Sequence, residues 1–193
     1  MSNDVWPLVH AERAALIADL EGLPEDRWDR PSGCARWTVH DVVAHLVDVA
    51  ESTRLGFVRD MISAGFDFDR QNDRGIARAR GATPAQTLHR LKAAATRTTM
   101  PPAPRESRIV EEVVHGEDIR GPLGITRHYP REAVERSLRY QIRTSTRFGG
   151  AAELVADVRL VATDLDFACG EGPEIRDTAL ELLMATTGRK ALR

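Results

Sequence analysis

Apolar residues recur at spacings of three, four and seven along much of the chain, which is the pattern of an amphipathic helix. Near the start, four of them are spaced by four, seven and four positions: Val5, Val9, Leu16 and Leu20. Gly22 and Pro24 follow, and both residue types favour the end of a helix. The pattern therefore predicts a first helix that ends near residue 20. A loop over residues 21–37 follows, with Trp28 and Trp37 available to anchor it.

A second helix is predicted to begin at Thr38 and to run to about Ala64. Thr38 is a favourable N-cap residue, and Asp41, three positions later, completes a pattern like that of a capping box. Apolar residues continue along one face of this segment: Val42, Leu46, Val49 and Phe57. Residues 65–81 then predict a long crossover that is either irregular or includes a short helix.

Further helices are predicted after the crossover, over residues 83–101, 107–120 and 130–149. Thr83 and Pro84 are a strong start signal, because threonine caps a helix and proline fits its first position. Gly121 and Pro122 are expected to stop the middle segment. Long helices joined by one lengthy connection predict a mainly α fold, an up-down four-helix bundle with a long crossover.

The pattern changes after Gly150. Residues 154–162 are rich in β-branched side chains and roughly alternate, and residues 165–169 could form the hairpin partner of that strand. Pro173 is then expected to open a last helix that ends at Gly188. The chain is therefore divided into a helical bundle over residues 1–150 and a small β-β-α appendage over residues 151–193.

Composition limits the class of protein more than its function. The chain has 193 residues, of which 42% are apolar and 29% charged, and its formal net charge is −2. Such a chain has no overall field that would attract nucleic acid or an anionic membrane. Lys92 and Lys190 are its two lysines, and the resulting arginine bias is typical of a GC-rich, actinobacterium-like genome. Two distant cysteines, no signal peptide and no membrane-spanning apolar run favour a cytoplasmic location.

Two of the predicted helices carry histidines beside apolar residues. His45 falls between Val42 and Val49 on the inner face of its helix. On the other helix, Glu111 and His115 are four residues apart and so share a face. Two imidazoles and a carboxylate suit a divalent transition metal, and three protein ligands leave one position open for water or substrate. This ligand set does not separate zinc from iron or nickel.

Other interpretations of these residues remain open from spacing alone. Glu112, three residues before His115, could replace Glu111 as the ligand, and either histidine could instead be a hydrogen-bonded core residue. Asp41, one turn before His45, could orient the His45 ring. Asn72 could be a polar contact near the site entrance. Cys34 has no histidine or lysine at motif spacing and is expected to be unreactive.

The segment from Trp37 to Val47, WTVHDVVAHLV, resembles a signature of the DinB-like superfamily, in its mycothiol-dependent maleylpyruvate isomerase branch. The segment from Glu111 to Asp118 resembles the second metal motif of that branch, and residues 160–189 resemble its C-terminal region. This resemblance implies a helical bundle with a divalent ion, typically zinc, held by residues matching His45, Glu111 and His115. It also implies mycothiol as a cosubstrate and Arg189 as a clamp for a substrate carboxylate. A structural alternative for Arg189 is a favourable interaction of its charge with a helix C-terminus.

These observations predict a metal-dependent transferase or isomerase, in which a metal-activated thiolate attacks a small electrophile. The alternatives are metal-assisted hydrolysis, a non-catalytic metal-binding protein, and a helical bundle without a ligand. The expected partners are a small thiol and an electrophilic substrate. A homodimer through exposed faces of the bundle is also considered, whereas nucleic acid and membrane are not expected partners.

Overall fold

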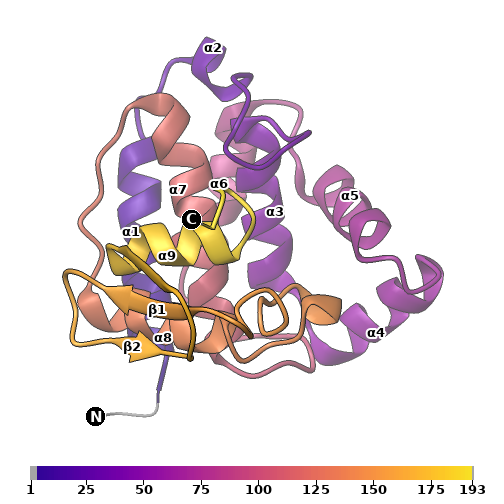
Figure 1. The fold of residues 1–193 in the computed structure, drawn as a ribbon. Coiled ribbons are helices and arrows are strands. Elements are labelled where there is room, and N and C mark those ends of the chain that lie inside the picture. The colour runs from indigo at the N-terminus through magenta and orange to yellow at the C-terminus, as the bar shows by residue number, and fades with distance from the viewer. Residues whose placement is uncertain (1–3, 193) are drawn as a thin grey trace.

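The computed structural model describes residues 4–192. Four helices form a closed ring in which each packs against two others, α1 against α6 and α7, and α3 against the same two. Figure 1 shows them side by side. Their bounds are α1 Trp6–Leu20, α3 Val39–Glu51, α6 Pro84–Ala94 and α7 Glu106–Leu123. The predicted four-helix bundle is therefore confirmed.

The starts of these helices follow the predicted capping chemistry. Thr38 Oγ1 accepts a hydrogen bond from Asp41 N (3.2 Å), and Asp41 Oδ2 accepts one from Thr38 N (2.9 Å), which completes the capping box at α3. At the start of α6, Thr83 Oγ1 accepts from Gln86 N, but the prediction that this helix extends to residue 101 is wrong. It ends at Ala94, and the carbonyl oxygen of Arg97 beyond it accepts a hydrogen bond from a buried arginine of α1 instead of continuing a helix.

The single helix predicted from Thr38 to Ala64 is in fact two helices. Ser52 and Thr53 have extended backbones between α3 and α4 (Arg54–Ser63), and Thr53 Oγ1 accepts from Gly56 N over 3.1 Å. A hydroxyl that caps a new helix competes with continuation of the old one, which explains the break. The crossover contains a second helix, α5 (Phe68–Ala79), which packs along α3. Of the two alternatives for residues 65–81, the one with a helix is correct.

Helix α7 does not stop before Gly121 and Pro122 but includes both, and it ends at Leu123, followed by the cap residue Gly124, whose φ of 70° is left-handed. Proline has no N–H for the carbonyl four residues earlier, which is that of Asp118. Gly33 N donates to this carbonyl over 2.8 Å instead. The loop before α3, which includes the short helix α2 (Glu25–Trp28), is thereby tied to α7.

The C-terminal region has one more strand than predicted. Helix α8 (Arg131–Gln141) is shorter than the expected 130–149, and a 3-10 turn, η1 (Thr146–Phe148), follows it. The sheet has the order β2-β1-β3. Its strands are β1 Arg159–Ala162, β2 Ala168–Cys169 and β3 Glu174–Asp177, and the last helix is α9 Ala179–Thr186.

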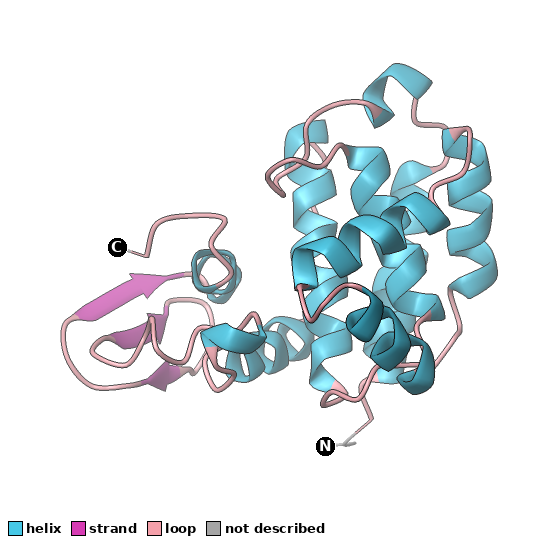
Figure 2. Ribbon diagram, turned by 90° about the vertical axis from the view of Figure 1, so that its right-hand side faces the viewer, coloured by secondary structure: helices cyan, strands magenta, loops and turns pink. Residues whose placement is uncertain are grey.

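The predicted antiparallel pairing of the first two strands is confirmed, although β1 is confined to the end of the expected 154–162 segment. The helix expected at Pro173 is replaced by β3, which pairs in parallel with β1. α9 begins only after Thr178, whose side chain accepts from Glu181 N. Figure 2 shows the strands gathered to one side of the helices.

Two apolar clusters hold the molecule together. One joins α3 to α1, α5, α6 and the end of α7, and it includes Leu16, Val42, Ile76, Leu91 and Ile119. The other joins α7 and α8 to the sheet and α9, and it includes Val113, Leu138, Leu160 and Leu183. The C-terminal elements therefore share a core with α7. Among the described residues, no helix has the length and apolarity needed to cross a membrane.

Candidate metal centre

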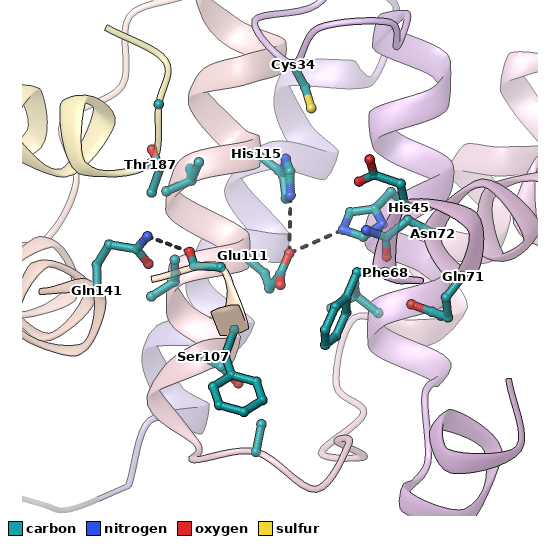
Figure 3. Close-up of a pocket in the computed structure, with 18 of the residues that line it drawn as sticks. Cys34, His45, Phe68, Gln71, Asn72, Ser107, Glu111, His115, Gln141 and Thr187 are labelled. Atoms are coloured by element: carbon teal, nitrogen blue, oxygen red, sulfur yellow. Dashed lines mark hydrogen bonds and ion pairs between the residues drawn. The ribbon is translucent and has the colours of Figure 1, made fainter. Parts of the chain in front are cut away.

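Three side chains from α3 and α7 converge on one point beside a cavity. His45 Nε2 lies 3.3 Å from Glu111 Oε2, and His115 Nε2 lies 3.2 Å from the same oxygen. The candidate ligand atoms of the three residues all lie within 4.8 Å of one another. Figure 3 shows both imidazoles pointing toward the Glu111 carboxylate. The three residues singled out in the sequence are thus brought together; we refer to them as the triad.

The local structure explains why Glu111 and not Glu112 faces this point. Glu111 and His115 are one turn apart on α7, so both face α3. Glu112 instead faces α1, where its Oε1 accepts from Arg13 Nε over 2.7 Å in the bundle interior. The two glutamates therefore have different tasks, and Glu112 is engaged in a buried ion pair away from the triad.

A chain of polar contacts orients His115. Its Nδ1 donates to Asp118 Oδ2 over 2.9 Å, and Asp118 also accepts from Arg189 Nη2 (2.8 Å) and Nε (3.2 Å). Because Nδ1 is held by a carboxylate, Nε2 is the ring atom that faces Glu111. Arg189, which was considered as a substrate clamp, lines the cavity, but most of its donors are engaged by Asp118 and by Thr187 O.

The charges of the triad are strongly coupled. Burial alone would raise the pKa of Glu111, but hydrogen bonds from His115 and His45 hold it well below its usual range. Burial alone would lower the pKa of His115, but its bonds with Asp118 and Glu111 raise it to about 9. Burial lowers the pKa of His45 despite the bond with Glu111. The metal-free site is therefore an anionic carboxylate between a cationic and a neutral imidazole.

The donor set fits a divalent transition metal. Two imidazole nitrogens and one carboxylate oxygen lie close enough for small adjustments to bring them around one ion, and an ion would replace the proton on His115. The neighbouring Asp118 supplies the outer carboxylate that metal-bound histidines commonly have. These residues could therefore hold an ion with a ligand position open toward the cavity.

The partner expected for His45 is not the one observed. Asp41 is engaged in the capping box and in an ion pair with Arg80, so it does not orient the imidazole. His45 Nδ1 has no hydrogen-bond partner among the described residues. The Trp37 ring instead lies 5.0 Å from the His45 ring and 6.1 Å from that of His115, measured between centroids. Packing against tryptophan, rather than a carboxylate, thus limits the movement of His45.

The triad forms part of the wall of a cavity of about 840 Å³. Its lining comes from the loop before α3, from α5, from α7 and from the segment after α9. Asn72 is among the lining residues, but it lies on helix α5 and not on a loop. A volume of this size lies within the range of sites for small molecules and cofactors.

Cys34 also lines the cavity, with its sulfur toward His115 in Figure 3. Its Sγ belongs to a second group, with His115 and Asp118, of candidate ligand atoms within 4.8 Å of one another. Burial raises the pKa of this thiol, so it stays protonated near neutral pH, as expected of an unreactive cysteine. The sequence did not place Cys34 near the triad, because a loop held by Gly33 and Asp118 brings it there.

Two further residues of the site were given no role from the sequence, although Asp118 ends the second segment that carries the family resemblance. Asp118 is three residues beyond His115, so helical spacing could have identified it as the orienting carboxylate. Arg108 is three residues before Glu111 and lines the same cavity. No spacing rule distinguishes Arg108 from the many surface arginines, because its burial depends on α3.

Comparisons with known proteins relate about half of the chain to a family by sequence and nearly all of it to solved structures by fold. Residues 9–103 match the family model of the mycothiol maleylpyruvate isomerase N-terminal domain. A solved structure of a histidine-to-alanine mutant of mycothiol-dependent maleylpyruvate isomerase matches with a TM-score of 0.66 and 14% identity. The structure of that isomerase without this mutation matches with a TM-score of 0.63 and 15% identity. Each alignment covers 96% of this chain and 88% of the other. No curated protein sequence matches the chain.

Proposed function

We propose that the chain, whose residues 9–103 match the family model of the mycothiol maleylpyruvate isomerase N-terminal domain, is a metal-dependent enzyme that joins a small thiol to an electrophile. The product would be a thiol conjugate or, if the thiol leaves again, an isomer. The observation that supports this proposal most directly is the convergence of His45, Glu111 and His115 on one wall of a large cavity.

The residues of the triad would hold the ion, and zinc is the ion that we propose. Bound there, the ion would lower the pKa of a coordinated thiol, so that the thiolate is available near neutral pH. Asp118 keeps the Nδ1 proton on His115 and so directs Nε2 toward the ion. Trp37 packs on both imidazoles, which restricts their rotation and the access of water from that side.

Mycothiol is the thiol that we propose, because the matched family and both solved neighbours are named for it. A cavity of about 840 Å³ has room for a thiol together with a second small molecule. Arg189 borders the cavity from the C-terminal side, and we propose that its remaining N–H groups contact the bound substrate.

We also propose that two copies of the chain associate through α4. Leu55, Val58 and Ile62 are exposed on this helix, at spacings of three and four residues that put them on one face, and Phe66 beyond its end is exposed as well. The buried Met61 adjoins this face, so the helix has both an exposed and a buried apolar surface. A helix of this kind is usually covered on both sides, and exposed apolar patches commonly mark interfaces.

The proposed function is tested by metal content and thiol dependence together. Purified protein should contain close to one equivalent of zinc, and His45→Ala and His115→Ala should lose it. His89→Ala is the matched control, because His89 is exposed on α6 outside the cavity. Metal-loaded protein should convert electrophiles from a panel only when mycothiol is added.

Each alternative function has its own result in this experiment. Turnover that proceeds equally without thiol would replace the proposal with metal-assisted hydrolysis. Stoichiometric zinc that raises the melting temperature without turnover of any substrate would indicate a non-catalytic metal-binding protein. Equal zinc uptake by the wild type and both histidine variants would refute the metal site itself.

A further inference from the structure

The cavity contains a buried cation without a close counter-ion. Arg108 on α7 is 5% exposed and lines the cavity. Its Nε donates to Ser107 Oγ over 3.4 Å, its Nη1 donates to Val49 O over 3.4 Å, and Nη2 lies 3.9 Å from an oxygen of Glu111. All three contacts are long, so they offset little of the desolvation cost of a buried guanidinium.

The other arginines in comparable positions are paired closely. Arg13 Nε lies 2.7 Å from Glu112, Arg120 Nε lies 2.7 Å from Asp19, and Arg189 Nη2 lies 2.8 Å from Asp118, each measured to a carboxylate oxygen. In the part of the chain from residue 4 to residue 192, Arg108 is the buried arginine that lacks such a partner. Unlike Arg13 and Arg120, Arg108 also lines the cavity beside the triad, which suggests that its missing partner is a ligand.

We propose that Arg108 is an anion-binding residue of this cavity, and that it binds a carboxylate of the small molecule that reacts beside His45, Glu111 and His115. A planar guanidinium matches a carboxylate through two parallel hydrogen bonds. Because Nη2 is 3.9 Å from Glu111 Oε1, the bound carboxylate lies next to the triad. The remainder of the substrate would then lie beside His45, Glu111 and His115, the residues that would hold the metal and, through it, the thiol.

The surroundings of Arg108 favour a singly charged carboxylate over phosphate. Glu111 lies close enough to Arg108 to repel a phosphate group, which concentrates two charges on one centre, more strongly than a carboxylate group, which carries one. Arg108 lies in the first turn of α7, where the backbone N–H groups of Ser107 and Arg108 already donate to Pro104 O and Arg105 O, which leaves the guanidinium as the main donor. One guanidinium supplies the two parallel donors that a carboxylate uses.

The reaction part of this inference rests on the proposed function, but the binding part does not. It is tested on protein freed of metal by dialysis, with malonate as the probe and malonamide as its neutral counterpart. Calorimetric titration should show that malonate binds and that Arg108→Met weakens it by about tenfold or more, as expected for loss of a charge-assisted pair. Arg36→Met is the matched control, since Arg36 also lines the cavity but has a side chain that is 63% exposed. It should bind malonate like the wild type.

A second measurement separates binding from a structural role. A buried charge without a close partner costs stability, so Arg108→Met should unfold at the same temperature as the wild type or higher. A clear loss of thermal stability would make Arg108 a structural residue and overturn the proposal. So would equal affinity for malonate and malonamide, or malonate binding that survives Arg108→Met. Phosphate that binds more tightly than malonate would overturn the choice of carboxylate.

The two proposals can fail separately. Malonate binding through Arg108, combined with no thiol-dependent turnover, would refute the proposed function and leave the anion site intact. Thiol-dependent turnover that is unchanged in Arg108→Met would refute the anion site and leave the proposed function intact.

Discussion

Replacing Asp118 with asparagine should flatten the pH dependence of stability of the metal-free protein. Asp118 is 1% exposed and accepts from His115 Nδ1 over 2.9 Å. Burial alone would lower the pKa of His115, and the bonds with Asp118 and Glu111 raise it to about 9. Asparagine keeps the shape of the side chain but removes the negative charge that favours the imidazolium. The pKa of His115 should therefore fall in this variant.

The magnitude follows from the difference between the folded and unfolded protein. The pKa of His115 rises from 6.5 to about 9 on folding, which corresponds to about 3 kcal/mol. Because the folded pKa is the higher one, this stabilisation is fully present below about pH 6.5 and is lost as the pH rises through about 9. The free energy of unfolding should therefore decrease over this interval.

Urea unfolding at several pH values measures this decrease in the metal-free wild type, in Asp118→Asn and in His115→Gln. Burial also raises the pKa of the Cys34 thiol, which contributes a decrease of the same sign at the upper end of the interval. The difference in slope between the wild type and His115→Gln isolates His115. Asp118→Asn should have an intermediate or flat slope. A wild-type slope no steeper than that of His115→Gln would refute the assigned charge state.

The affinity for metal should rise with pH, whereas the free energy of unfolding of the metal-free protein falls. An ion at the triad must displace the proton from His115 Nε2, so affinity should rise about tenfold per pH unit below about pH 9. Chelator competition at several pH values measures this rise. Zinc affinity that does not change with pH would show that His115 is neutral before the ion binds.

Three shorter predictions concern other parts of the fold. Glu112→Gln should lower the free energy of unfolding by about 3 kcal/mol, because it leaves Arg13 buried without a carboxylate partner. The variant should still bind as much zinc as the wild type, and loss of zinc would assign Glu112 to the site. Thr38→Ala removes the capping box of α3 and should lower the free energy of unfolding by about 1 kcal/mol in a denaturant titration. An unchanged unfolding midpoint would contradict that role of Thr38. Leu55→Glu should convert a dimer to a monomer in light scattering, whereas a wild type that is already monomeric would refute the α4 interface.

Local chemistry accounts for what could be predicted of the fold. The apolar spacing that begins at Val5 and the capping residues Thr38 and Thr83 act within one or two turns, so they identify helices and their starts without knowledge of the rest of the molecule. The ends were predicted less well, because they depend on partners elsewhere. Pro122 remains inside α7 since Gly33 satisfies the carbonyl that proline leaves free, and β3 exists because β1 lies beside it.

The same division applies to the site. The sequence by itself determined the bundle and the candidate ligands. His45 lies on the apolar face of its helix, which must face the core, and Glu111 shares a helix face with His115. It left Glu112 open, and only the tertiary structure placed Arg13 against it. Tertiary structure alone also decided the distance between α3 and α7, the link from Asp118 to Arg189 and the burial of Arg108. Residue spacing fixes which side chains share a face, whereas long-range packing fixes which faces meet and which charges remain without a partner.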